Sequence, residues 1–564
     1  MPQTTALPLT ITRRGALAAA VAALAWRPTF AAATKAPTFD PAQADALHVL
    51  NRFAFGPAPG DLERVAQSGP QAWIAEQLQP DRIALPAFLV DQLSTLRTPA
   101  ETQREMLRDY RDQAKAAKQA KAAESADADG KKAQTEAGAE RRQEIARATV
   151  EAGEERLLQA LNSPRQLQEV LVDFWFNHFN VFQGKGQVRV LVENYEREAI
   201  RPFVLGRFRT MLGATAKHPA MLVYLDNWLS AAPGYEPRRK RGNAAKATGL
   251  NENYARELME LHTLGVDGGY TQQDVTELAR ILTGWTLQPE RPLRARRMLT
   301  GMDTTASTRG DSLFAFDNAR HDDGTKTWLG HVVPPNGQLE GEFALDVLAR
   351  HPATAKHIAF KLARRFVADE PAPALVDRLA RRFTDSDGDL RAVMQALADS
   401  PEFRDPRPTK FKTPTQYVLS AVRATGIATT NVRPLMVTLA QLGQPLYGCQ
   451  TPDGWHDTEA DWLNPNAITQ RVNFATALAS GRLPLQRADD PNAPLPGMKA
   501  MERQADRAMK SDQAVDGATP EVEVNTLLAT LGPQISDKTR ATIASSRPAL
   551  RAALVLGSPD FMRR

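Results

Sequence analysis

Residues 251–285, NENYARELMELHTLGVDGGYTQQDVTELARILTGW, carry the apolar period that decides the fold. Tyr254, Leu258 and Leu261 recur at the spacing that places side chains on one face of an α-helix. Thr271 begins a second helix as its N-cap, after a glycine-rich loop. The same period recurs over most of the chain, so the sequence predicts a mainly α fold with a multi-helix globular core.

Further helices are expected in the C-terminal half of the chain. The apolar spacing predicts a continuous helix over residues 343–367 and shorter helices over 373–383 and 390–398. The segment 391–404 also resembles the segment 551–564, because in each an apolar helix is followed by Ser, Pro, an acid and Phe. Proline disfavours helical backbone at the residue before it, so this pattern indicates a helix stop.

Two segments depart from the pattern of buried helices. Residues 101–156 are rich in Ala, Lys, Glu, Arg and Gln and nearly lack large apolar residues. This composition predicts a long charged helical insertion, folded as a hairpin that turns near Asp129 and Gly130. A solvated surface insertion is favoured over a partner-binding arm. Residues 300–335 combine short apolar bursts with turn residues, which predicts a small β-hairpin or loop excursion.

The chain is long enough for more than one structural unit. Its 564 residues exceed what one hydrophobic core usually holds. We divide it, in order, into an export signal (1–33), an N-terminal helical segment (34–100), the charged helical insertion (101–156), a helical core (157–480), a loop or partly disordered stretch (481–520) and C-terminal helices (521–564).

The first residues match a bacterial twin-arginine (Tat) export signal. Arg13 and Arg14 precede an Ala-rich apolar stretch, and Ala31–Ala33 offers a cleavage site. The sequence therefore predicts a periplasmic or secreted protein that has no transmembrane segment once the signal is removed. Cleavage also removes Arg27 and no acid, so the formal charge falls from +5 to +2. The charge thus gives no reason to expect a nucleic-acid partner.

Cysteine usage limits the chemistry. Cys449 is the only cysteine, which excludes an intrachain disulfide and any cysteine-rich zinc or iron–sulfur site. A metal would need His, Asp or Glu ligands. The sequence also lacks a Gly-x-Ser-x-Gly elbow, a Walker loop and a dinucleotide fingerprint.

The helix at 251–265 carries the first candidate site. Glu257 and Glu260 lie on a polar stripe, whereas His262 falls on the apolar side of the helix. Glu257 and His262 are five residues apart, so they do not form a neighbouring metal-binding pair on a straight helix. Glu260 also has Arg256 four residues before it as an ordinary partner.

A second inward-facing histidine occurs in LVDFWFNHFNVF, residues 171–182. His178 shares an apolar face with Phe174 and Trp175. A buried imidazole must satisfy both of its ring nitrogens or lose stability. Each histidine alone is more often a core residue than a ligand, but His178 and His262 together could form one polar cluster.

Two polar loops are further candidates. DNARHDDGTK, residues 317–326, places His321 and Asp322 in an oxygen-rich turn of the kind that binds metal ions, although such turns also occur as ordinary Asx turns. The loop 444–462 combines Trp455, His456, Asp457 and Trp462. Aromatic-rich loops of this kind bind sugars or peptides, and they can equally close a core.

The chain resembles a large bacterial family called domain of unknown function 1800. The matching stretches include HVLNRFAFGPAPGDLERV, FWFNHFNV, the 251–285 region, FDNARHDDGTKTWLG, HPATAKHIAFKLARRFVADEP and LGQPLYGCQTPDGW, and they span most of residues 47–478. The resemblance implies no established activity. It implies export, and possible association with exported proteins that resemble alkaline phosphatases and sulfatases, which members tend to be encoded beside.

Two hypotheses follow for the function. The first is a cell-envelope hydrolase assisted by a metal or by carboxylate and histidine groups, with Glu257, His262 and His178 as catalytic residues. A divalent metal in that site would be bound by His178, His262, His321 and Asp322. The second is a non-enzymatic accessory or scaffold protein that binds an exported partner, such as an alkaline phosphatase-like or sulfatase-like protein.

Overall fold

The computed structural model describes residues 40–123, 128–236, 249–287, 312–407, 410–486, 503 and 520–564. Within this part, only the backbone of residues 116–142 and 144 is described. The expected export signal, residues 1–33, lies outside the described residues, as does most of the expected 481–520 loop.

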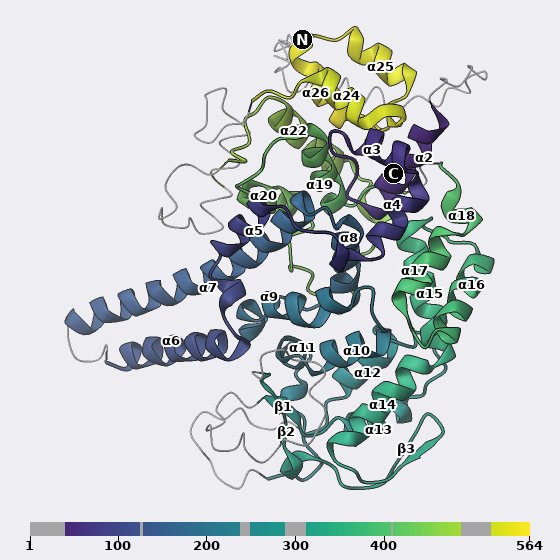
Figure 1. The fold of residues 1–564 in the computed structure, drawn as a ribbon. Coiled ribbons are helices and arrows are strands. Elements are labelled where there is room, and N and C mark those ends of the chain that lie inside the picture. The colour runs from purple at the N-terminus through teal and green to yellow at the C-terminus, as the bar shows by residue number, and fades with distance from the viewer. Residues whose placement is uncertain are drawn as a thin grey trace, which may run out of the picture.

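Helices dominate the described chain, which confirms the predicted mainly α fold (Figure 1). The helices before residue 300 are α2 (Pro41–Phe53), α3 (Asp61–Ser68), α4 (Pro70–Gln77), α5 (Ala87–Ser94), α6 (Gln103–Ala123), α7 (Ala128–Asn162), α8 (Gln166–His178), α9 (Val192–Tyr195), α10 (Phe208–Lys217), α11 (Pro219–Tyr224), α12 (Glu252–Glu260) and α13 (Gln272–Ile281). Those after it are α14 (Gln338–Arg350), α15 (Pro352–Phe366), α16 (Pro373–Asp385), α17 (Leu390–Ala398), α18 (Pro401–Arg404), α19 (Pro414–Thr425), α20 (Arg433–Gln441), α21 (Glu459–Trp462), α22 (Pro465–Ala479), α24 (Val524–Leu531), α25 (Asp537–Ala544) and α26 (Pro548–Leu556).

Two small antiparallel sheets interrupt the helices. Their strands are β1 (Trp285–Leu287) paired with β2 (Phe314–Phe316), and β3 (Lys326–Trp328) paired with β4 (His331–Val333). Three of the four strands fall in the predicted 300–335 excursion. The remaining strand, β1, lies before that excursion and begins with the fully buried Trp285.

The charged insertion forms an arm. Helices α6 and α7 pack side by side, and their distal parts extend away from the body of the molecule (Figure 1). Helix α6 ends at Ala123 and α7 begins at Ala128, so the chain reverses just before Asp129 and Gly130, close to where the sequence placed the turn. The C-terminal end of α7 enters the core, where Leu157, Leu158 and Leu161 are buried.

Segments from the two ends of the described chain pack together at one side of the molecule, where α2 and α3 lie beside α24 (Figure 1). Within the described residues, no helix combines the length and apolar character that crossing a membrane requires.

The expected helix over 343–367 is two helices, α14 and α15, that meet at His351. Pro352 occupies the first turn of α15, and the His351 side chain accepts a hydrogen bond from the Ala353 N–H. Proline disfavours helical backbone at the preceding residue, which explains the break. Helix α15 buries Ile358 and Leu362, leaving a polar face that forms one wall of the site described next.

A cavity between helices α8 and α15 and the 444–461 segment

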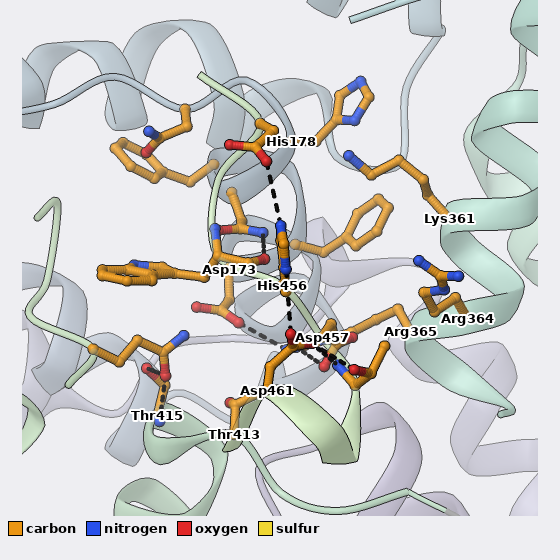
Figure 2. Close-up of a pocket in the computed structure, with 18 of the residues that line it drawn as sticks. Asp173, His178, Lys361, Arg364, Arg365, Thr413, Thr415, His456, Asp457 and Asp461 are labelled. Atoms are coloured by element: carbon orange, nitrogen blue, oxygen red, sulfur yellow. Dashed lines mark hydrogen bonds and ion pairs between the residues drawn. The ribbon is translucent and has the colours of Figure 1, made fainter. Parts of the chain in front are cut away.

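A cavity of about 420 Å³ lies where α8, α15 and the 444–461 segment meet (Figure 2). Apolar rings form part of its wall, including those of Phe174, Phe176, Phe360 and Trp455. Charged and histidine side chains form the rest. A volume of this size with mixed apolar and polar walls is typical of a site for a small molecule.

The polar face of α15 lines the cavity with one histidine, one lysine and two arginines. His357, Lys361, Arg364 and Arg365 all line it, and Figure 2 shows Lys361 reaching into it from the right-hand helix. Their spacing of four, seven and eight residues places them on one side of a helix. Arg365 is neutralised, because its Nη2 lies 2.7 Å from Oδ2 of Asp173 on α8.

Lys361 and Arg364 lack such neutralisation. Arg364 donates from Nε to the Asp369 carbonyl at 3.1 Å and lies over the Phe360 ring, but it forms no ion pair among the described residues. The partly buried Lys361 ammonium makes neither a hydrogen bond nor an ion pair with any side chain or backbone group that the structure describes. Burial lowers the pKa of Lys361 to about 8, with the nearby Asp453 opposing this shift and Arg364 adding to it.

An acid–histidine–acid chain lies in the loop that contains Trp455 and in the helix α21 that follows it. His456 contacts Asp461 through Nδ1 at 3.2 Å and Asp453 through Nε2 at 3.3 Å, as the dashed lines in Figure 2 show. Burial alone would lower the pKa of His456, but the hydrogen bonds to these two carboxylates raise it. Burial would raise the pKa of Asp461, but its hydrogen bonds with Thr458 and His456 lower it. His456 therefore carries its proton over a wider pH range than a free imidazole.

Two asparagines of the α8 region hold this segment in place. Asn177 donates from Nδ2 to the Trp455 carbonyl at 2.8 Å, and its Oδ1 accepts from the Trp455 N–H at 2.7 Å. Asn180 donates to the carbonyls of Cys449 and Thr451. The close approach requires glycine at Gly454, where φ is +76° and a Cβ would lie 2.2 Å from the Asn177 carbonyl oxygen.

The imidazoles of three histidines, His178, His262 and His357, lie near Lys361. His178 donates from Nε2 to the His262 carbonyl at 3.1 Å, and His357 does the same to the Leu261 carbonyl at 3.3 Å. The His178 ring centroid lies 6.3 Å from that of His262 and 6.1 Å from that of His357. Burial, reinforced by the charge of Lys361, holds the pKa of all three below the ordinary value. All three are thus neutral near pH 7.

The family model described as protein of unknown function (DUF1800) matches residues 48–563. The chain belongs to this family. The match extends beyond the residues 47–478 expected from the sequence, and it includes every element that lines the cavity. No curated protein and no solved structure matches the chain.

The expected catalytic residues of this DUF1800 protein occupy different positions around the cavity. His178 lines it and lies beside His262, as the sequence suggested, but they meet through a backbone carbonyl rather than through a shared ligand. His262 is buried behind it, and its Nε2 has no hydrogen-bond partner in the described structure. Glu257 is half-buried and not part of the lining. Burial raises its pKa, and the charges of Glu260 and Asp453 add to this, against Arg256.

The neighbours of Glu257 also differ from expectation. Arg256 donates to Gln272 at 2.7 Å, and Glu260 accepts from the Tyr270 hydroxyl at 2.8 Å. The expected pairing of Arg256 with Glu260 is therefore replaced by contacts with the segment that follows, because the loop after α12 folds back along the helix.

The expected metal-binding residues are not brought together in this DUF1800 protein. His321 contacts Glu340 at 2.9 Å, and Asp322 accepts from Nε and Nη2 of Arg280 at 2.9 and 3.0 Å. Glu340 also accepts from the fully buried Lys326 ammonium at 2.6 Å. Across the described ranges, no three His, Cys, Asp or Glu side chains gather in a group that could hold a metal ion. His321 and Asp322 thus anchor the β excursion instead of joining His178 and His262.

Sequence reasoning missed much of the cavity. The basic face of α15 was visible in HIAFKLARR as polar residues at helical spacing, but an apolar helix with such a face is usually a surface helix. The spacing of Asp453, His456 and Asp461 was also visible in PDGWHDTEAD. Nothing in either motif indicated that the two would line one cavity.

Proposed function

We propose that this chain is an exported hydrolase that uses a histidine and carboxylates for proton transfer in the cavity. The supporting observation is that one cavity contains both the Asp453–His456–Asp461 chain and the unpaired Lys361 ammonium. Hydrolysis needs a group that takes a proton from water, a group that gives a proton to the leaving group, and positive charge that stabilises the transition state. The cavity contains a candidate for each role.

In this proposal Asp453 accepts a proton from the attacking water, and protonated His456 donates one to the leaving group. Asp461 orients the His456 ring, since its other oxygen is held by the Thr458 N–H at 3.1 Å. Lys361 stabilises the negative charge that develops at the reacting centre. His178 contributes a neutral imidazole to the cavity wall. Glu257 and His262 do not line the cavity and have a structural role in this proposal.

The site is tested by turnover of a panel of aryl carboxylate, phosphate and sulfate esters. We expect His456→Gln and Asp453→Asn to lower kcat by about 100-fold or more, the usual range for a general acid or base. His331→Gln is the matched control, because His331 is exposed on β4 and does not line the cavity. Full activity of His456→Gln would exclude this histidine from the reaction.

Export is part of the same proposal. It rests on Arg13 and Arg14 and the apolar stretch after them. Replacing both arginines with lysine should leave the protein in the cytoplasm, as measured by fractionation of cells that express the full chain. Unchanged export of the double variant would contradict the Tat assignment.

A second candidate function is that of an accessory or scaffold protein for an exported partner. The observation that favours it is the α6–α7 arm, which extends from the body of the molecule and is accessible to a partner protein (Figure 1). The two candidates differ in whether the cavity or the arm carries the activity, so variants that affect only one of them separate the two.

A further inference from the structure

We infer that the cavity binds a small organic oxyanion, a phosphate, sulfate or carboxylate, whose charged group lies between Lys361 and Arg364 of α15. The inference names the ligand class of the cavity and rests on the proposed function only in treating that ligand as a substrate. It is argued from how the charges around the cavity are paired.

Most charged groups in the wall already have partners. Asp173 lies 2.8 Å from Arg156 and 2.7 Å from Arg365. Asp457 lies within 4 Å of both Arg365 and Lys410. These groups neutralise one another, so they offer a ligand little net charge.

Two positively charged groups of the cavity wall are left without such partners. Lys361 and the terminal nitrogens of Arg364 lie one turn apart on α15, and neither is ion-paired within the described part of the chain. Burying an ammonium without a partner is costly, and an oxyanion that accepts hydrogen bonds from both groups would offset that cost. Asp453 is near enough to influence Lys361 but does not reach ion-pair distance.

The imidazoles beside Lys361 are suited to an anionic rather than a cationic ligand. His178 donates its Nε2 proton to the His262 carbonyl, so Nδ1 holds a lone pair that has no partner in the described structure. This Nδ1 is itself buried, so the His178 ring lines the cavity only as a neutral group. The imidazole supplies no negative charge that would repel the anion.

The rest of the ligand faces an apolar wall. Phe174, Phe360 and Trp455 line the cavity, and its volume of about 420 Å³ exceeds what a single oxyanion fills. We therefore expect an anion attached to an aromatic or other apolar body to bind more tightly than the anion alone.

The test is isothermal titration calorimetry on the full-length mature protein at constant ionic strength, with phenylphosphonate, methylphosphonate, inorganic sulfate and acetate as probes. Phenylphosphonate is not hydrolysed, so binding is measured apart from turnover. We expect it to bind several-fold more tightly than methylphosphonate. Lys361→Met should weaken binding by about tenfold or more, the loss expected for one charge-assisted hydrogen bond. Lys361→Arg should largely retain it.

Two further variants make the result specific. Lys356→Met, an exposed lysine on the same helix, is the matched control and should bind as the wild type does. Asp453→Asn should bind phenylphosphonate more tightly, because it removes the negative charge nearest Lys361, while the proposed function predicts that it loses turnover. Binding should also weaken above about pH 8, where Lys361 loses its proton. Of the groups around Lys361, Asp453 raises its pKa and Arg364 lowers it, while His178, His262 and His357 are already neutral at that pH.

The outcomes separate the two proposals. Equal phenylphosphonate affinity of the wild type and Lys361→Met, or no binding of any probe, would overturn the oxyanion site whatever the turnover assays give. Binding that depends on Lys361 in a protein that hydrolyses no ester would support the oxyanion site and contradict the proposed hydrolase.

Discussion

Asn177 connects α8 to the segment that carries Trp455 and His456. It contacts both the N–H and the carbonyl of Trp455, 278 residues away in the sequence. Because both atoms of its amide are used, no shorter or apolar side chain can replace it. Asn177, together with Asn180, thus sets the position of the segment that carries the acid–histidine–acid chain.

We expect Asn177→Ala to lower the free energy of unfolding by about 1–3 kcal/mol, because it leaves buried backbone groups of the loop unpaired. It should also weaken phenylphosphonate binding, since Trp455 lines the cavity. Urea denaturation and calorimetry measure the two effects. Asn473→Ala, on an exposed face of α22, is the control and should change neither. Wild-type stability and binding in Asn177→Ala would show that other contacts hold the loop.

A buried pair of carboxyl groups makes the stability of the molecule depend on pH. Glu155 on α7 and Glu193 on α9 share a hydrogen bond. Burial raises the pKa of both, and for Glu193 the charge of Glu155 raises it further. The folded state therefore holds protons at pH values at which the unfolded state has already released them. The corresponding stability is present below the unfolded pKa of about 4.5 and is lost as the pH rises through the raised folded values.

Glu155→Gln keeps a hydrogen-bonding group and removes one titrating carboxyl. We expect it to be more stable than the wild type at pH 8, by about 1 kcal/mol, and to gain less at pH 5. Thermal unfolding at the two pH values measures this difference. Glu63→Gln, exposed on α3, should show no such pH-dependent gain. A gain of equal size at both pH values would contradict a shared proton.

At the scale of elements, the sequence predicted helix caps and helix stops, which depend only on residues close together in the chain. Thr271 is the N-cap of α13 as expected, and together with Asp274 it forms a capping box. The two resembling segments also share one geometry, because Ser400 accepts from the Phe403 N–H and Ser558 accepts from the Phe561 N–H, each at 3.2 Å. The break at Pro352 was equally visible in the sequence, but the apolar period on both sides of it favoured one continuous helix.

The α6–α7 arm is an element whose removal should leave the cavity unchanged. Among the described residues, Arg156 in the C-terminal part of α7 lines the cavity. No other described residue of α6 or α7 does so. We therefore expect deletion of residues 116–142, with a short glycine linker in their place, to leave phenylphosphonate affinity and ester turnover within about twofold of the wild type. Lys361→Met is the opposite control, because it should weaken phenylphosphonate binding while leaving the arm intact. A deletion that abolishes binding to an exported partner while retaining turnover would favour the scaffold function for the arm alone.

At the scale of the whole molecule, the sequence predicted that His178 and His262 could meet, and they do. It did not predict that Lys361 would lie near His178, or that Asp453 would lie near Lys361, because neither motif indicates its distant neighbour. Helical periodicity shows which face of a helix is buried but not which other element covers it. The cavity depends on such long-range contacts, and the fold class does not.

A buried ion-pair network joins the helices around the cavity. Arg156 of α7 contacts Glu196 and lies 2.8 Å from Asp173 of α8, whose other oxygen contacts Arg365 of α15. Arg201 contacts Glu196 at 3.1 Å. Burial would raise the pKa of Glu196, but Arg156 and Arg201 lower it. Breaking a network of this kind leaves a buried charge without its partner, which costs more than the pairing itself contributes.

We therefore expect Arg156→Met to lower the free energy of unfolding by about 3 kcal/mol, since it leaves Glu196 and Asp173 each with one remaining cation. Arg207→Met is the matched control, because the Arg207 and Asp387 side chains are both 53% exposed and such a pair contributes little. Urea denaturation of both variants measures the difference through the transition midpoint at unchanged slope. If Arg156→Met unfolds within about 1 kcal/mol of Arg207→Met, the helices around the cavity are held by apolar packing and not by this network.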